Sequence, residues 1–131
     1  MMEQVGPAQK CAMARALRWG FEMEDLVVYV TLRPRKRRDL SYLLKVAFED
    51  FPRRAPSYVF VDHGTKEVTD TAWPLNVRHG AQPPGICTPG TREFHEHFHA
   101  NDTGYPWNPE RYTVLDTLYR IHQLMERGIE A

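Results

Sequence analysis

Three strand-like segments follow one another between residues 26 and 61, and this block constrains the fold more than any other feature of the sequence. The first, residues 26–32 (LVVYVTL), is rich in the β-branched residues that strands favour. In the second, residues 39–50, apolar and polar side chains alternate with the period of a strand that has one buried face. The third, residues 57–61 (SYVFV), follows two proline-containing pairs. Because consecutive strands usually pair with each other, the block predicts an antiparallel β-meander.

A helix is expected on each side of this meander. Residues 7–19 place small and aromatic side chains at helical spacing, and Gly20 follows as a residue that commonly ends helices. Nearer the C-terminus, Asn108 suits an N-cap and Pro109 suits the first position of an amphipathic helix, which Gly128 is expected to end.

The segment between residues 69 and 105 differs from the rest of the chain. It contains several prolines and glycines and little periodicity, apart from a histidine-rich stretch. A segment of this length without regular structure is uncommon in a compact domain unless it has a function. The sequence therefore predicts a single α+β domain over residues 1–131, ordered as N-terminal helix, antiparallel meander, long active-site loop segment and C-terminal helix.

The composition limits the classes of partner. The 131 residues include 17 basic and 17 acidic side chains, so no overall field attracts the protein to nucleic acid or to an anionic membrane. The one basic run, residues 33–38 (RPRKRR), is interpreted as a solvated loop between two strands. No apolar stretch has the length of a signal-peptide core or of a membrane span. Cys11 and Cys87 lie far apart in dissimilar settings, which favours free thiols in a reducing cytoplasm over a disulfide.

Cys87 is the first candidate for chemistry. Prolines and glycines on both sides of it disfavour a helix interior or a central strand, so we expect it on a loop. A loop thiol becomes a nucleophile where neighbouring cationic or hydrogen-bonding groups favour its thiolate, and histidines are close in sequence. The alternative is a buried cysteine that acts as a small hydrophobic residue, which is the expectation for Cys11.

Residues 91–102 (TREFHEHFHAND) supply three histidines close together. As a helix, this stretch stacks His95 over His99, and as a strand it places His95, His97 and His99 on one side. Either arrangement suits zinc or another borderline metal, with Cys87 as a fourth ligand.

Two further interpretations of the histidines remain open. His95, Glu96 and His99 match the letters of the H-E-x-x-H metalloprotease motif, although the neighbouring prolines and glycines leave room for only a short helix. The other interpretation is a polar loop that carries surface imidazoles and binds nothing.

Three motifs in a fixed order resemble the ubiquitin-conjugating enzyme family. They are FPRRAPSYVF at residues 51–60, GIC at residues 85–87 and WNP at residues 107–109. In that family an N-terminal helix leads into an antiparallel meander and a proline-rich passage. A long segment then carries the catalytic cysteine, and W-x-P opens a terminal helix. The order matches over residues 7–127, so the resemblance implies the ubiquitin-conjugating (UBC) fold.

The resemblance also implies a reaction. Cys87 would accept a ubiquitin-like protein as a thioester from an activating enzyme and transfer it to an amine, with no cofactor required. Such transfer needs a thiolate or a base-assisted thiol, and hydrogen-bond donors for the oxyanion. Family members usually place the asparagine of His-Pro-Asn eight residues before the cysteine, where this chain has His79. His79 would then take the role of the asparagine, or Asn76 or Asn101 would approach instead.

A second departure from the family is the distance of 20 residues from Cys87 to Trp107, which the histidine stretch fills. This insertion resembles a bacterial family predicted to bind metal and encoded beside ubiquitin-like proteins, ThiF-like activating enzymes and JAB-type peptidases. Such systems are implicated in antiviral defence against phage. The resemblance implies one Cys, one Glu and two His as metal ligands. Several choices of Glu and His in this stretch satisfy that pattern, and the favoured set is Cys87, Glu93, His95 and His99.

Two hypotheses follow, and they make opposite demands on Cys87. In the first, the protein is a conjugating enzyme whose histidines tune the pKa of an open thiol or stabilise the oxyanion; these histidines are His79, His95, His97 and His99. Glu93 or Asp102 would orient or deprotonate the incoming amine. In the second, the protein is a non-catalytic module on the same fold, and Cys87 and the histidines close around zinc.

By analogy with the family, the first helix and the neighbouring hairpin would contact the activating enzyme. Arg15, Arg18 and residues 33–38 are the candidates for that contact.

Overall fold

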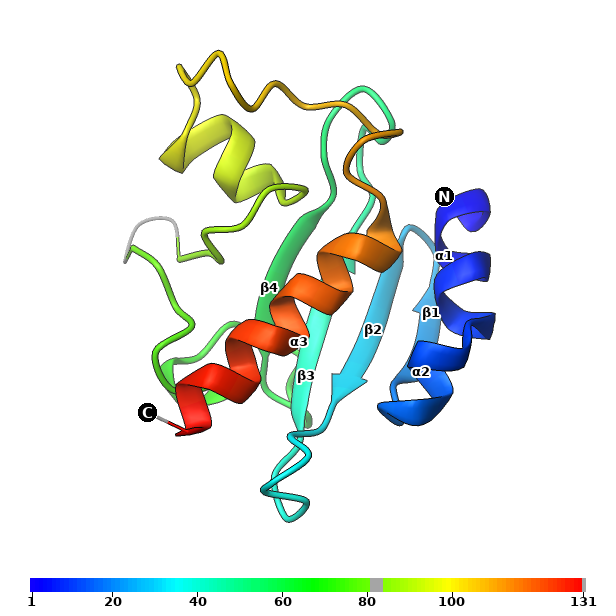
Figure 1. Ribbon diagram of the computed structural model, residues 1–131, viewed down its shortest axis with the longest axis vertical. Coiled ribbons are helices and arrows are strands. Elements are labelled where there is room, and N and C mark those ends of the chain that lie inside the picture. Colours follow the sequence, from blue (N-terminus) through cyan, green and yellow to red (C-terminus); the bar gives the residue numbers. More distant parts are fainter. Residues whose placement is uncertain (81–83, 131) are drawn as a thin grey trace.

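A computed structural model describes residues 1–80 and 84–130 of the chain. Four strands form one antiparallel sheet in the order β1-β2-β3-β4 (Figure 1). The strands are β1 (Gly20–Glu24), β2 (Val27–Leu32), β3 (Tyr42–Ala47) and β4 (Ser57–Val61). The helices are α1 (Met2–Lys10), α2 (Ala12–Ala16) and α3 (Val114–Glu130). None of the helices in the described part of the chain is both long enough and apolar enough to cross a bilayer.

The α+β class and the meander are confirmed. β4 has the predicted bounds, and β2 lacks only the first residue of the predicted strand. β3 is shorter than the predicted segment 39–50, because a turn in which Leu40 N donates to Arg37 O (3.0 Å) precedes it. The block of contiguous strands therefore pairs in sequence order.

β1 is a strand that the sequence did not predict. Gly20 was expected to end a helix, but it is the first residue of β1 and pairs with Thr31 of β2. β1 lies at the edge of the sheet and its side chains are largely exposed. An edge strand of this kind needs no apolar alternation, so it gives no periodic signal.

The prediction of one helix over residues 7–19 was wrong. α1 begins earlier, at Met2, and the chain is extended at Cys11, with φ −73° and ψ 158°. The Cys11 Sγ accepts a hydrogen bond from Ala14 N (3.3 Å), so the thiol acts as the N-cap of α2. Arg18, at φ +58°, then turns the chain into β1.

The predicted start of the C-terminal helix was also wrong. Asn108 Oδ1 accepts a hydrogen bond from Glu110 N (2.9 Å), but this closes a separate turn. α3 begins at Val114, after Thr113, whose Oγ1 accepts from Asp116 N (3.2 Å). Both residues are good caps, and only the second precedes an uninterrupted helix.

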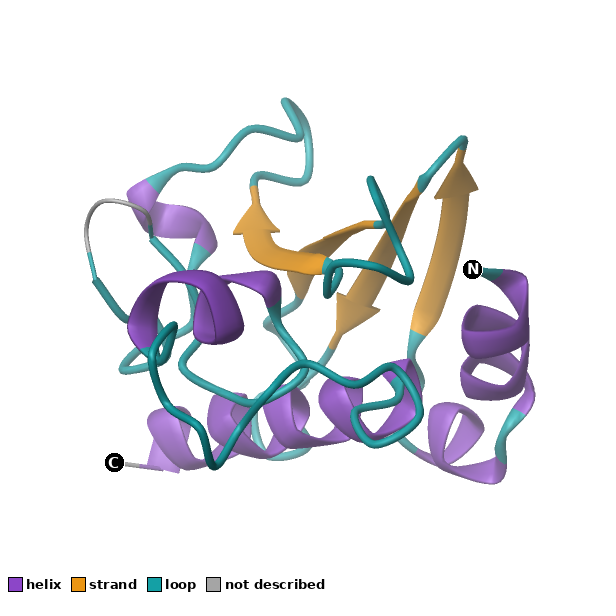
Figure 2. Ribbon diagram, turned by 90° about the horizontal axis from the view of Figure 1, so that it is seen from above, coloured by secondary structure: helices purple, strands orange, loops and turns teal. Residues whose placement is uncertain are grey.

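α3 lies across one face of the sheet (Figures 1 and 2) and fills the main hydrophobic core. Gly128 does not end α3 as expected: it lies inside the helix, where an added Cβ would come within 2.0 Å of Leu75 O. Burying each large apolar side chain contributes roughly 1.5–3 kcal/mol. The core residues of the sheet and α3 are Val28, Val30, Leu32, Leu44, Val46, Tyr58, Phe60, Val114, Leu118, Ile121 and Met125.

Candidate active site

Cys87 lies on a loop that is anchored on both sides of the exposed thiol. Before it, His79 and Gly85 exchange two backbone hydrogen bonds of 2.7 and 3.0 Å, and Ile86 is fully buried in the main core. After it, Thr88 is buried. Thr91 Oγ1 donates toward Ile86 O (3.2 Å) and Thr88 O (3.1 Å), which ties the two flanks together. The expected loop position of Cys87 is thus observed, and the residue is exposed.

α3 supports the same loop from below. Arg120 donates from Nε to Thr88 Oγ1 (3.3 Å) and from Nη2 to Pro89 O (2.8 Å). Gly90 has φ +101°, and an added Cβ would lie 2.1 Å from Thr117 Oγ1 of α3. Only glycine allows the loop to turn this close to the helix.

The histidine stretch forms a single π-helical turn, Phe94–Phe98. His99 N donates to Phe94 O (2.8 Å), five residues back along the chain. Residues five positions apart lie roughly 140° apart around an α-helix. In this wider turn the Phe94 and His99 rings stack instead, with centroids 4.3 Å apart and an interplanar angle of 26°. The stretch is thus neither the regular α-helix nor the strand that the two sequence-based alternatives assumed.

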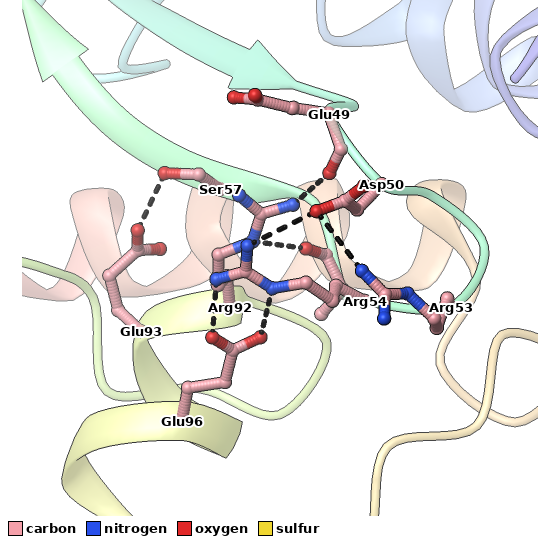
Figure 3. A network of polar contacts seen from close by, with 9 residues as sticks. Glu49, Asp50, Arg53, Arg54, Ser57, Arg92, Glu93 and Glu96 are labelled. Atoms are coloured by element: carbon pink, nitrogen blue, oxygen red, sulfur yellow. Dashed lines mark hydrogen bonds and ion pairs between the residues drawn. The ribbon is translucent and has the colours of Figure 1, made fainter.

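An ion pair joins this turn to the connection between β3 and β4 (Figure 3). Arg54 donates to both carboxylate oxygens of Glu96, at 3.0 and 2.6 Å, and it also contacts Asp50 (3.4 Å). The Arg54 contact lowers the pKa of the Glu96 carboxyl below its ordinary value. Glu96, the general base in the H-E-x-x-H interpretation, is therefore held as the partner of an arginine.

The residues just before the turn hold β4 (Figure 3). Arg92 donates to Ala55 O (2.9 Å) and to Glu49 O. Glu93 accepts from Ser57 Oγ (2.6 Å) and from Tyr58 N (3.1 Å). Burial raises the pKa of the Glu93 carboxyl, and these two donors offset part of that effect. Both carboxylate oxygens of Glu93 are thus used to fix the start of β4.

His99 is the histidine that the structure brings to Cys87. Its Nε2 lies 3.7 Å from Cys87 Sγ, and its Nδ1 lies 3.3 Å from Asp102 Oδ2. The second oxygen of Asp102 accepts from Gly104 N (2.9 Å), which orients the carboxylate. A carboxylate at Nδ1 favours the tautomer with its proton on Nδ1, and this leaves Nε2 free to accept the thiol proton.

The protonation state of Cys87 explains why the contact with His99 Nε2 matters for a reaction at the thiol. Although the residue is exposed, partial burial of the thiol raises the pKa of Cys87. The group is then a thiol near neutral pH and needs a base to act as a nucleophile. The Cys87 N–H donates to no acceptor within residues 1–80 and 84–130. It is therefore available to the oxyanion that forms when Sγ attacks a carbonyl group.

Both ring nitrogens of His95 are hydrogen-bonded to backbone groups. Its Nε2 accepts from Gly90 N (3.0 Å), and its Nδ1 donates to Tyr105 O (2.9 Å). Burial lowers the pKa of His95, so the ring is neutral, as both hydrogen bonds require. His95 therefore joins the turn at Gly90 to Tyr105 at the end of the long segment, and neither of its nitrogens is free for Cys87.

The other two histidines also lie apart from the thiol. His97 is exposed, and no contact within the described residues joins it to Cys87. The exposed His79 places its ring edge-on to Phe98, with centroids 4.4 Å apart. Of the four predicted catalytic histidines, the structure thus brings His99 alone into reach of Cys87.

The implied metal-binding set is not gathered at one point. Cys87 and His99 are adjacent, whereas Glu93 binds β4 and His95 binds two backbone groups. Across the residues that the structure describes, no group of three or more His, Cys, Asp or Glu side chains is placed to hold a metal ion. Zinc binding stays a prediction that this arrangement does not support.

A pocket of about 480 Å³ opens beside His99 and Asp102. Its walls come from the connection between β3 and β4, from the π-helical turn and from the loop that follows the turn. Asn101, Tyr105 and Trp107 are among its lining residues. A group bound in this pocket would lie next to the imidazole that contacts Cys87.

Asp102 and Phe94 are the parts of the site whose roles the sequence did not reveal. Asp102 was considered only as a group that would act on the amine. The Asp-x-Gly turn three residues after His99 was the available signal, because such turns aim a carboxylate at nearby groups. The stacking of Phe94 on His99 depends on the π-helical winding, and no periodic pattern in the sequence predicts it.

No protein-family model matches this sequence, and a comparison with curated proteins finds no match either.

Proposed function

We propose that the protein is a conjugating enzyme of a bacterial ubiquitin-like pathway that acts in antiphage defence. Cys87 accepts a ubiquitin-like protein from a ThiF-like activating enzyme and transfers it to an amine, and a JAB-type peptidase acts in the same pathway. One observation carries the proposal: an exposed loop thiol lies 3.7 Å from an imidazole whose other nitrogen faces a carboxylate. The order of helix, antiparallel meander, cysteine segment and helix agrees with the resemblance to conjugating enzymes.

In the first step the ubiquitin-like protein moves between two sulfurs. Cys87 Sγ attacks the carbonyl carbon of the activating enzyme's thioester while His99 Nε2 takes the thiol proton. The Cys87 N–H would donate to the oxyanion. The old carbon–sulfur bond then breaks, and the leaving sulfur receives the proton. The exposure of Cys87 suits this step because two other proteins must reach the sulfur.

In the second step an amine attacks the carbonyl carbon of the Cys87 thioester. His99 Nε2, which no longer contacts a thiol proton, takes a proton from the attacking nitrogen and returns it to Sγ as the bond breaks. Asp102 stabilises the imidazolium that forms and keeps the ring oriented. One imidazole thus serves both transfers. It is His99, which follows Cys87 in the chain, and not His79, which occupies the sequence position of the family's asparagine.

The basic run at residues 33–38 supports a docking site for the activating enzyme. It lies in the connection between β2 and β3, next to the end of α2. Arg18, Arg33, Arg35 and Arg38 line one pocket of about 260 Å³ there. Arginine side chains bind carboxylates in bidentate geometry, so an acidic segment of the partner would fit this surface.

The test adds the cognate activating enzyme, the ubiquitin-like protein and ATP, and separates the products on a non-reducing gel. We expect a thiol-sensitive adduct with the wild type and with Cys11→Ala, and none with Cys87→Ala. If the activating enzyme is visibly charged and the wild type still forms no adduct, the proposal fails.

A further inference from the structure

An acyl group on Cys87 would lie beside His99 and Asp102. The chemistry of these side chains bears on which class of acceptor attacks it. We propose that the acceptors of this centre include hydroxyl groups, so that the acyl group passes from Cys87 to an oxygen and forms an ester. The ubiquitin-like cargo rests on the proposed function above. The preference for an assisted hydroxyl rests on the geometry of His99 and the pocket alone.

The proton of the acceptor distinguishes a hydroxyl from an amine in this reaction. An amine that has lost its ammonium proton to water can attack a thioester before any base acts, because its remaining proton needs to leave only after the carbon–nitrogen bond has formed. A hydroxyl is a far weaker acid and keeps its proton until the attack, so it needs a base placed at the reacting atoms. His99 Nε2, 3.7 Å from Sγ, is such a base, and Asp102 lies on the opposite edge of the ring. The same division of roles lets serine hydroxyls react in hydrolases that use histidine and aspartate.

The step balances without an added reagent. The acceptor oxygen attacks the carbonyl carbon and its proton moves to His99 Nε2, while the carbonyl oxygen becomes an oxyanion near the Cys87 N–H. The carbon–sulfur bond breaks, and the proton passes from Nε2 to Sγ. The products are an oxygen ester and the free Cys87 thiol.

The charges of the pocket beside His99 favour a neutral acceptor. Glu96 and Asp102 are the two acidic side chains that line this pocket of about 480 Å³. Arg54 holds Glu96 through two hydrogen bonds, and Asp102 is engaged by His99 Nδ1 and Gly104 N. Arg53 and Arg54 also line the pocket, so its two acidic side chains are balanced by two basic ones and its walls carry no net negative charge that would attract the ammonium group of a lysine. The aromatic rings of Tyr105 and Trp107 offer an apolar wall instead.

The experiment uses a small acyl group, so it needs no partner protein. Cys87 is acetylated by a low-molecular-weight acetyl thioester in a Cys11→Ala background, and intact mass confirms one acetyl group. Release of the acetyl group is then followed with N-acetylserinamide and, separately, with Nα-acetyl-lysinamide. Each ester or amide product is identified by mass, and esters are distinguished by their cleavage with hydroxylamine.

We expect the wild-type residues at the site to transfer acetyl to the serine hydroxyl. His99→Gln should slow that transfer by roughly 10²–10⁴-fold, the usual contribution of a general base, and should slow transfer to lysine by less. Asp102→Asn should likewise slow acetyl transfer to the serine hydroxyl more than acetyl transfer to lysine. His97→Gln is the matched control, because His97 is an exposed histidine of the same turn, and it should change neither rate.

Three results would overturn the inference: no acetylation of Cys87, acetyl transfer to lysine alone, or equal hydroxyl transfer by His99→Gln and wild type with unchanged circular dichroism. Failure of the activating enzyme to charge Cys87 is a separate result. It would end the proposed function and leave the acetyl-transfer result standing.

Discussion

At the scale of single residues, the site depends on which histidine is left free. His95 and His99 are four residues apart and equivalent in the sequence. The Gly90 N–H and the Tyr105 carbonyl engage both nitrogens of His95, so His99 remains to meet Cys87. These backbone groups belong to turns whose positions follow from the tertiary fold. Local spacing could predict a thiol near histidines, but it could not select His99.

The raised pKa of Cys87 predicts the pH dependence of its alkylation. Burial disfavours the thiolate, so at pH values below the raised pKa less of the nucleophile is present than in an ordinary thiol. In a Cys11→Ala background, we expect the rate of iodoacetamide alkylation to reach half its maximum at a higher pH than that of a free cysteine peptide. A midpoint below that of the peptide would show a preformed thiolate and contradict a role for His99 as base.

Glu93 predicts a pH effect on stability. Its folded pKa is raised, so the stability that it contributes is full below the unfolded pKa and is lost as pH rises through the folded pKa. We expect the free energy of unfolding of the wild type to fall relative to that of Glu93→Gln as pH rises above the unfolded pKa of about 4.3. Urea denaturation at several pH values measures the difference, and a wild type that gains on the variant over this range would refute the assignment.

At the scale of elements, the active-site loop and α3 act as one unit. Gly90 meets Thr117 at a distance that excludes any Cβ, and Arg120 donates to two residues of the loop. The loop that carries Cys87 is thus positioned by the helix that also fills the core. Mutations in α3 should change the reactivity of Cys87 without touching the thiol.

Gly90→Ala tests this coupling. The new Cβ would overlap Thr117 Oγ1 at 2.1 Å, and φ +101° is strained for alanine. We expect a loss of about 3 kcal/mol in the free energy of unfolding, from strain and overpacking together. Gly6→Ala is the control, because nothing lies within 4 Å of a Cβ at that position in α1. It should be neutral or slightly stabilising, and an equal loss in both variants would argue against the tight contact.

Some secondary-structure elements could be predicted from the sequence and others could not. The strand at residues 57–61 was predicted with its correct bounds, because its apolar run is flanked by prolines and a polar turn. β1 was missed because an exposed edge strand has no apolar period. The π-helical turn Phe94–Phe98 was missed because its residues are equally compatible with an α-helix. Its tertiary contacts, from Arg54 to Glu96 and from Ser57 of β4 to Glu93 just before the turn, join residues far apart in the sequence.

At the scale of the whole molecule, one buried pair links the two ends of the chain. Trp19 Nε1 donates to His122 Nδ1 of α3 at 3.1 Å, and burial lowers the pKa of His122. The imidazole must stay neutral to accept this bond. The Trp19–His122 hydrogen bond therefore ties the segment between α2 and β1 to α3, the helix that supports the active-site loop.

His122 predicts a loss of stability in acid. Because its folded pKa is lowered, its contribution is present above the unfolded pKa of about 6.5 and is lost as pH falls through the folded value. We expect the free energy of unfolding to decrease from pH 7 to pH 5, and His122→Gln should flatten that decrease. His63→Gln, which alters an exposed histidine next to Ser41, is the histidine-to-glutamine control. Equal slopes in all three proteins would contradict the assignment.

The central claim is that Cys87 is an open nucleophile that carries an acyl cargo. Its most direct test compares wild type with Cys87→Ser in one charging reaction containing activating enzyme, ubiquitin-like protein and ATP, read by intact mass before and after thiol and hydroxylamine. We predict an adduct that thiol removes from the wild type, and a slower-forming adduct on the serine variant that resists thiol and yields to hydroxylamine. Identical thiol-resistant adducts on both proteins would place the cargo on another residue and contradict the account.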